Sequence, residues 1–124
     1  MKRLVAAVIL FVFVISAYIW GYIYIDNACK QAQNYLINCV DVYEADKDAT
    51  DEAEKLEKYW SKKEKGLSFF ANHGDIDAIE LAINSLKSYS KTKDNEIFYE
   101  YSGTVKTLLH QLMEDTAPTM HSIF

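Results

Sequence analysis

Glycine and proline are scarce in this chain. Its 124 residues include four glycines and one proline, whereas β-hairpins, tight turns and phosphate-binding loops depend on these two residues. The sequence also lacks a Gly-x-Ser-x-Gly elbow and a His-Glu-x-x-His zinc motif. These absences disfavour a β-rich fold, hydrolases and nucleotide-binding enzymes. We therefore expect an all-α protein that is not an enzyme and needs no cofactor.

Positive charge is scarce outside the N-terminus. Lys2 and Arg3 lie before residue 25, and the rest of the chain holds 11 basic residues and all 18 acidic ones. The resulting net charge of −7 repels phosphate backbones, so nucleic acid is not an expected partner. This part has about a hundred residues, which is enough for one modest core and not for two domains.

Apolar sequence, by contrast, is abundant at the N-terminus. Leu4 to Ile25 is a run in which Ser16 is the only small polar side chain. As a helix it would be about 33 Å long, which matches a hydrocarbon layer of about 30 Å. A secretory signal has a shorter apolar region that ends in small residues at the cleavage site. Here the nearest small residues are Ser16 and Ala17, and Ile15 stands where cleavage would require another small side chain. We expect an uncut transmembrane helix rather than cleavage after Ala17.

The two ends of this run differ in a way that predicts its orientation. Lys2 and Arg3 flank the first end, and positive residues favour the cytoplasmic side. Aromatic residues, which favour the headgroup layer, crowd the other end; they are Tyr18, Trp20, Tyr22 and Tyr24. We expect a single-pass cell-membrane protein with a cytoplasmic N-terminus and an extracytoplasmic C-terminal part.

The rest of the chain shows helical periodicity. Residues 1–25 form the expected cytoplasmic tip and anchor, and residues 26–46 continue it as a helical stem without a breaker. Polar turns at 46–51, 72–74 and 92–96 separate three further helices, which we expect to form an antiparallel bundle over residues 47–116 packed on the stem. Pro118 disfavours helix continuation, so 117–124 is expected to be a C-terminal tail. The predicted core is Leu56, Trp60, Phe70, Ile79, Ile83, Leu86, Phe98, Tyr101, Val105, Leu108 and Leu112.

The densest cluster of metal-type side chains is His73, Asp75, Asp77 and Glu80. His73, Asp77 and Glu80 can share a helix face, which makes them weak candidates for a cation site. The alternative is local structure, with Asp75 or Asp77 capping a helix and Asp77 and Glu80 forming a capping box. Glu80 also falls on the apolar face, where we expect a polar contact with His73, Tyr89 or a lysine. We favour the structural interpretation.

Three other features carry weaker signals. His110 and Glu114 are one helical turn apart, and His121 follows in the tail, but such a pair is common on solvated helix faces. Cys29 and Cys39 on one helix would be about 15 Å apart, too far for a disulfide, which leaves free thiols or a bond from Cys29 to a second chain. Four lysines surround Trp60 and either touch anionic lipid or wall polymers, or form a solvated helix face; they are Lys58, Lys62, Lys63 and Lys65.

From end to end the chain resembles the bacterial family known as domain of unknown function 4363. The segments that carry the resemblance are "MKRLVAAVILFVFVI" with its Tyr-rich exit, "LEKYWSKKEK", "NHGDIDAIELAINSLKSY" and "HSIF". The positions that match in type are Trp60, His73, Asp77, Ile79, Glu80, Leu86 and Lys87, whereas Gly74 and the tail before His121 depart from the pattern. The resemblance implies an anchored helical domain of unassigned activity, sometimes encoded beside a multi-pass membrane protein.

These observations together predict a membrane-anchored helical domain with a protein-interaction or structural role at the cell envelope. Its expected partners are the lipid bilayer and either a multi-pass membrane protein or a second copy of itself. The alternative is a small binding module that holds a cation or ligand at His73, Asp77 and Glu80.

Overall fold

The computed structural model describes the backbone of residues 1–91 and 94–123, and the side chains of residues 1–91 and 94–114. The described backbone forms four helices and no strand. The helices are α1 (Lys2–Glu44), α2 (Thr50–Leu67), α3 (His73–Tyr89) and α4 (Asn95–Ile123). The all-α prediction, with a long N-terminal helix that continues into a bundle, is therefore confirmed.

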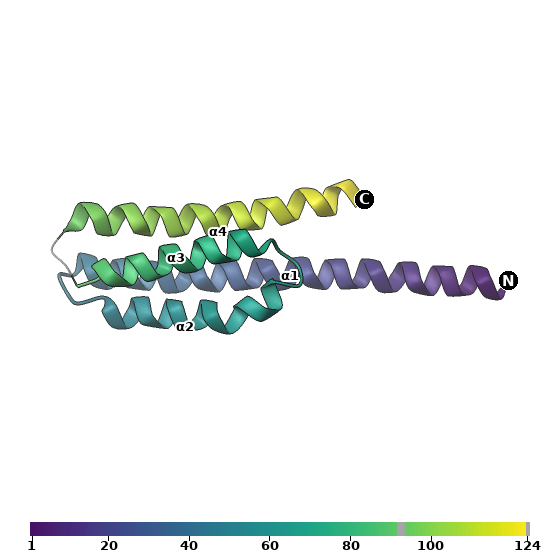
Figure 1. The fold of residues 1–124 in the computed structure, drawn as a ribbon, viewed down its shortest axis with the longest axis horizontal. Helices are drawn as coiled ribbons and strands as arrows, with labels where there is room; N and C mark the ends of the chain where they lie inside the picture. Colours follow the sequence, from purple (N-terminus) through teal and green to yellow (C-terminus); the bar gives the residue numbers. More distant parts are fainter. Residues whose placement is uncertain (92–93, 124) are drawn as a thin grey trace.

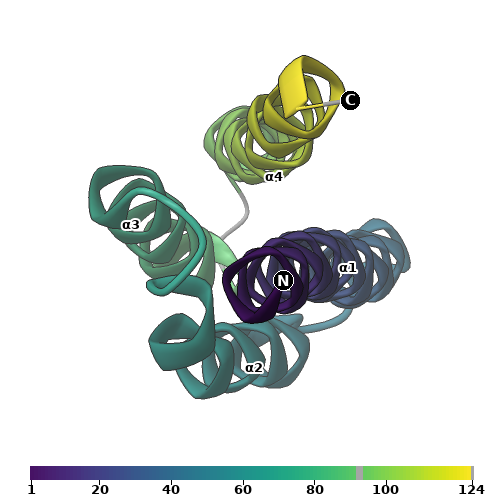
Figure 2. The same ribbon diagram turned by 90° about the vertical axis from the view of Figure 1, so that its right-hand side faces the viewer.

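The four helices form a closed antiparallel ring. Each helix packs on the one before and the one after it, and α4 packs on α1 to complete the ring. Figure 2, a view along the bundle, places the helices at the corners of a quadrilateral in this order. Figure 1 shows that α1 is much longer than the bundle, so its N-terminal half projects from one end, beyond the ends of the other helices. We call this end of the bundle the base.

Helix α1 runs without a joint from its projecting half into the bundle. No proline occurs in it, and its single glycine, Gly21, lies at the point where packing begins. The buried residues of α1 recur every three or four positions, as one face of a helix requires; they are Gly21, Ile25, Ala28, Cys29, Ala32, Leu36, Cys39 and Tyr43. The first twenty residues contribute no buried side chain. One helix therefore combines an exposed apolar half with a half that packs in the core.

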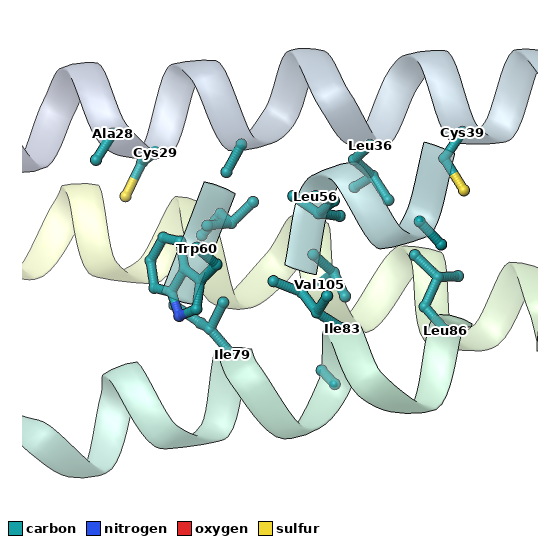
Figure 3. Close-up of a cluster of buried hydrophobic side chains, with 14 of the residues drawn as sticks. Ala28, Cys29, Leu36, Cys39, Leu56, Trp60, Ile79, Ile83, Leu86 and Val105 are labelled. Carbon is teal, nitrogen blue, oxygen red and sulfur yellow. The ribbon is translucent and has the colours of Figure 1, made fainter. Parts of the chain in front are cut away.

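Trp60 of α2 lies near the middle of the core. Its side chain is fully buried, and its indole N–H donates a hydrogen bond to the Ile76 carbonyl oxygen at 3.3 Å, so the only polar atom of the ring has a partner. Figure 3 shows Trp60 between α1 and α3. Among the predicted core residues, the structure partly buries Tyr101 and Leu108 and buries Leu56, Trp60, Ile79, Ile83, Leu86, Phe98, Val105 and Leu112.

Phe70 lies elsewhere than expected. Helix α2 ends at Leu67, so Phe70 belongs to the α2–α3 turn and not to the apolar stripe of the helix. Its side chain is 39% exposed and packs against α1 at the base of the bundle. The placement of Phe70 in the core was wrong, because the stripe was extended three residues beyond the end of the helix.

The cap of α3 also differs from the prediction. Asn72 is the N-cap residue, and its side-chain oxygen accepts a hydrogen bond from the Gly74 amide at 2.7 Å. Asparagine is among the best N-cap residues, and its position places Asp75 in the first turn and Asp77 beyond it. Neither aspartate is the cap, so the proposed capping box with Glu80 was wrong.

Helix α4 extends further than expected. We expected a tail over 117–124, but the helix continues through Pro118 to Ile123. Proline removes one backbone hydrogen bond, but its fixed φ of about −65° is itself helical, so the chain can continue. As a result the end of α4 extends past the α2–α3 turn (Figure 1). The turn expected at 92–96 falls partly on residues 92–93, outside the described residues.

Polar and aromatic contacts close the end of the bundle away from the base. Asp46 adopts a left-handed φ of 59° just after α1 and turns the chain toward α2. The ring of Tyr43 stacks on Phe98 with centroids 3.6 Å apart, and the Tyr43 hydroxyl donates to Asn95 Oδ1 at 2.8 Å. The Ala49 amide donates to a carbonyl oxygen after α3 at 3.2 Å. These contacts tie the α1–α2 and α3–α4 connections together at this end.

Candidate functional site

The base of the bundle contains a close contact between a glycine and a phenylalanine. The ring of Phe70, from the α2–α3 turn, lies against the backbone of Gly21 in α1. A Cβ atom added at Gly21 would lie 2.4 Å from Phe70 Cδ1, so any side chain there would force the ring to shift. Trp20 flanks the same ring in an edge-on contact with centroids 6.4 Å apart. Gly21 therefore provides the gap in the α1 surface that Phe70 occupies.

In a second contact of the same kind, the glycine belongs to α2 and the aromatic ring to α1. Tyr24 of α1 places its ring and hydroxyl against Gly66 near the end of α2, and an added Cβ there would lie 2.3 Å from the hydroxyl oxygen. The Lys63 ammonium lies 5.4 Å from the centroid of the Tyr24 ring and 5.7 Å from that of Tyr59, within the range of cation–π attraction. The Lys63 ammonium thus lies over both rings.

These two contacts fix the α2–α3 turn to α1 at the place where α1 leaves the bundle. We call Gly21, Tyr24, Gly66 and Phe70 the glycine–aromatic junction. Each glycine accepts an aromatic ring from the other helix or turn, so neither segment can slide or rotate without a steric clash. The junction therefore packs the α2–α3 turn and the end of α2 directly on α1 where the projecting half begins.

The projecting half of α1 exposes an unusual amount of apolar surface. Only 6% of its most apolar 18-residue window is buried, and among the described helices α1 is the one long and apolar enough to cross a membrane. Single exposed apolar residues are normal, but a contiguous face of this extent marks an interaction with a partner or a membrane. Of the predicted interface aromatics, Tyr18 and Trp20 are exposed, whereas Tyr22 and Tyr24 are half-buried by the bundle.

The candidate cation residues do not converge in the described residues. His73 and Asp77 are exposed, and Glu80 is partly buried. The structure places the Glu80 carboxyl beside Glu64 of α2, a neighbour that sequence reasoning did not consider. Across the described side chains, no three His, Cys, Asp or Glu groups lie close enough together to hold a metal ion.

Glu64 is the most perturbed carboxyl in this region. One of its oxygens, Oε1, is buried without a hydrogen-bond partner. Burial, followed by the hydrogen bond and the charge of Glu80 and by the charge of Asp77, raises the pKa of Glu64 to about 7. The pair is a titratable contact between α2 and α3, and it accounts for the polar position of Glu80 on the apolar face.

The remaining candidates behave as ordinary structural residues where the structure describes them. His110 Nε2 lies 3.0 Å from Glu114 Oε1 on an exposed face of α4, and the His121 side chain lies outside the described residues. Cys29 and Cys39 are both buried and unbonded. Figure 3 shows them at opposite ends of the drawn part of α1, so they do not face each other. The burial of Cys29 also opposes a bond to a second chain.

Sequence reasoning missed the glycine–aromatic junction. A signal was present, because Gly21 interrupts an aromatic-rich stretch and the pair Phe69-Phe70 follows Gly66 by three residues. The two halves of the contact are about 45 residues apart, however, and periodicity within one helix does not reveal which residue of another helix it meets.

Comparisons with known proteins identify the family. A family model described as a domain of unknown function (DUF4363) matches residues 19–123. The match begins in the aromatic end of the projecting half and covers the junction and the whole bundle. No curated protein and no solved structure matches the chain. Since the matched region is most of the sequence, the chain belongs to the DUF4363 family.

Proposed function

We propose that this protein is a single-pass membrane protein whose helical bundle has a structural or protein-interaction role at the extracytoplasmic face. The observation that carries the proposal is the exposure of the apolar half of α1. A core helix of a soluble protein would be buried by its neighbours, whereas this half has almost no covered surface. Lipid is the environment that satisfies an exposed, predominantly apolar helix of this length.

Charge asymmetry supports the proposed orientation. Lys2 and Arg3 stand before the apolar half, and the part beyond it is net negative. Basic residues that flank a transmembrane helix are retained in the cytoplasm, and the residues just beyond this run offer no competing positive excess. The bundle therefore lies outside the cytoplasm, with its base toward the membrane.

The junction supports a structural role. Because α1 has no joint and the glycine–aromatic junction fixes the bundle to it, a force or displacement on the bundle is transmitted to the transmembrane helix. A flexible tether would have a linker rich in glycine or serine at this position, and this chain has a continuous helix instead. Such an arrangement suits a protein that holds a partner at a fixed height and orientation, either a multi-pass membrane protein or a second copy of the chain.

Cysteine labelling in intact cells tests the anchor and its orientation. Cys29 and Cys39 are replaced by alanine, and one new cysteine is introduced at exposed Ser61 or at Lys2. A membrane-impermeant maleimide should label position 61 in intact cells and position 2 only after permeabilisation. Labelling of position 2 alone would overturn the orientation, and recovery of chains in the soluble fraction would overturn the anchor.

Crosslinking from intact membranes tests the interaction role. The full-length protein is compared with a variant in which residues 4–25 are replaced by an unrelated transmembrane helix. Partners retained by this variant are recognised by the bundle, and partners lost are recognised within the bilayer. A chain that crosslinks to nothing, including itself, in either form would contradict an interaction role.

The alternative function, a cation or ligand site around His73, Asp77 and Glu80, predicts a different result. Divalent cations would raise the melting temperature and a chelator would lower it, and the effect would be lost in His73→Ala and Glu80→Ala. Under the proposed function, cations and chelator leave the melting temperature of the wild type unchanged.

A further inference from the structure

The α2–α3 turn carries an apolar side chain that no described side chain covers. Phe69 is 83% exposed, although its neighbour Phe70 is held in the glycine–aromatic junction. A phenylalanine at the tip of a turn is unfavourable in water, because burying such a side chain is worth about 1.5 to 3 kcal/mol. The turn lies at the base of the bundle, on the side of the projecting half of α1 (Figure 1).

The junction determines the height of Phe69 along α1. Because the Phe70 ring contacts Gly21 and Trp20, the turn lies level with the aromatic end of the projecting half. The proposed function places this level at the headgroup layer of the outer leaflet, where aromatic rings are favoured. Phe69 therefore reaches the lipid surface without any change in the fold.

The apolar surface is continuous from the projecting half to the turn. A groove of about 510 Å³ lies between them, with Phe13, Val14 and Ala17 among the residues on the α1 side and Phe69 and Phe70 on the turn side. Continuity of this kind distinguishes the turn from Leu81 of α3, another large apolar side chain that is 69% exposed but lies in the middle of a helix.

The charges around the turn have both signs. Lys62 and Lys65 are exposed on the last turns of α2, and in the described part of the chain no carboxylate forms an ion pair with either of them. Asp75 and Asp77 are exposed at the start of α3. The lysines suit lipid phosphates, but the aspartates offset them, so the phenylalanine and not net charge must supply most of the attraction.

We propose that the α2–α3 turn is a second membrane contact, in which Phe69 inserts into the outer leaflet beside the transmembrane helix while Lys62 and Lys65 lie among the lipid phosphates. The inference rests on the proposed anchor and adds a contact that the anchor alone does not require. The partner is phospholipid. The bundle then rests on the membrane by its base at two points, which prevents it from tilting.

The experiment uses the full chain in phosphatidylcholine vesicles, with Cys29 and Cys39 replaced by alanine. An environment-sensitive fluorophore is attached at Ser68→Cys, next to an intact Phe69, and lipids with a doxyl quencher near the headgroup are added. We expect a blue-shifted, lipid-quenched probe. Phe69→Ser should reduce the ratio of molecules with the turn inserted in the membrane to molecules with the turn in water about ten- to a hundredfold. The matched control Leu81→Ser should leave the quenching unchanged.

A second probe distinguishes failure of the inference from failure of the anchor. A fluorophore at Leu10→Cys should be quenched by a doxyl group deep in the acyl chains. If position 10 is quenched and position 68 is not, the anchor stands and the second contact is overturned. A position 68 probe that is blue-shifted but insensitive to the lipid quencher would mean that protein covers the turn, which also overturns the inference. Loss of quenching at position 10 would overturn the anchor itself.

An additional vesicle series tests the role of charge. Because the base carries both positive and negative side chains, replacing a quarter of the phosphatidylcholine with phosphatidylglycerol should change the quenching at position 68 by less than Phe69→Ser does. A larger effect of anionic lipid, lost in a Lys62→Gln and Lys65→Gln double variant, would overturn the assignment of the attraction to Phe69.

Discussion

The two halves of α1 differ both in apolar content and in surroundings. Up to residue 20 the helix is apolar on all sides and uncovered, whereas beyond Gly21 it presents one buried stripe of small and medium side chains and a polar opposite face. An all-round apolar helix needs an apolar medium, while a striped helix needs protein on one side and water on the other. The change at Gly21 therefore marks where the exposed apolar half of the helix gives way to the half that packs on protein.

The largest expected effect comes from placing a charge in the buried stripe. Ala32 is fully buried, so Ala32→Arg adds volume and an unpaired charge to the core. We expect a loss on the order of 5 kcal/mol in the free energy of unfolding, comparable to the whole stability of a small domain. Circular dichroism of the full chain in detergent micelles should show no cooperative melting. The neighbouring exposed variant Gln31→Arg should melt as the wild type does, and equal effects of the two would contradict the assigned stripe.

A matched pair of leucines compares the two halves directly. Leu36 is 4% exposed and Leu10 is 64% exposed. Leu36→Ala should lower the free energy of unfolding by about 2 to 5 kcal/mol, because it leaves a cavity in the core. Leu10→Ala should leave the free energy of unfolding in micelles unchanged within about 0.5 kcal/mol. Similar destabilisation by both changes would show that the projecting half packs on protein.

A charge in the projecting half should impair membrane insertion and leave the stability of the bundle unchanged. Val12→Arg places a guanidinium near the middle of the proposed transmembrane segment and should cost about 2.5 to 3.5 kcal/mol of insertion free energy. The fraction of chains in the membrane should fall in a fractionation assay, while the melting of the bundle should not change. Unaltered fractionation would argue against a membrane-spanning segment. Ile37→Arg, at an exposed position in the other half, is the control.

These comparisons depend on features that were predictable to different degrees. The helices and their turns followed from periodicity and polar clusters, and the stem was expected to be continuous because no breaker follows Gly21. The end of α2 was less predictable, since Phe70 fits the stripe by spacing and only the packed structure shows that it lies in a turn. Glu80 was expected to be partly buried, but its neighbour Glu64 lies on another helix and could not be inferred from spacing.

A smaller, pH-dependent effect is expected in the bundle. The fold raises the pKa of Glu64 from 4.5 to about 7, so between these values the folded state binds more protons than the unfolded state. The stabilising contribution of protonated Glu64 is complete below about pH 4.5 and is lost as the pH rises to about 7. Glu64→Gln should be more stable than the wild type at pH 8, and its stability should not show this decrease with rising pH. The measurement is the midpoint of urea unfolding as a function of pH. Glu54→Gln, on the same helix, should keep it.

The smallest expected signal is the reaction of the two thiols in the native state. Burial, with a smaller effect of Asp26, raises the pKa of Cys29 to about 12, and burial raises that of Cys39 to about 11. The reactive thiolates are therefore rare at neutral pH, and the side chains are also covered. Labelling by a maleimide should occur at the rate of unfolding and become rapid in urea. Rapid labelling of Cys29 in the folded protein would contradict its burial in the stripe.

The sequence by itself determined the helical class, the length of the apolar run, the charge asymmetry at its ends and the positions of most turns. These features depend on local composition and on the period of a single helix, which neighbouring residues specify. Tertiary structure decided that Gly21 accepts Phe70, that Tyr24 lies on Gly66, that Glu64 meets Glu80 and that Phe69 remains exposed at the base. Each of these involves side chains from separate helices or turns, and their contacts depend on how the helices rotate and slide when the whole core packs.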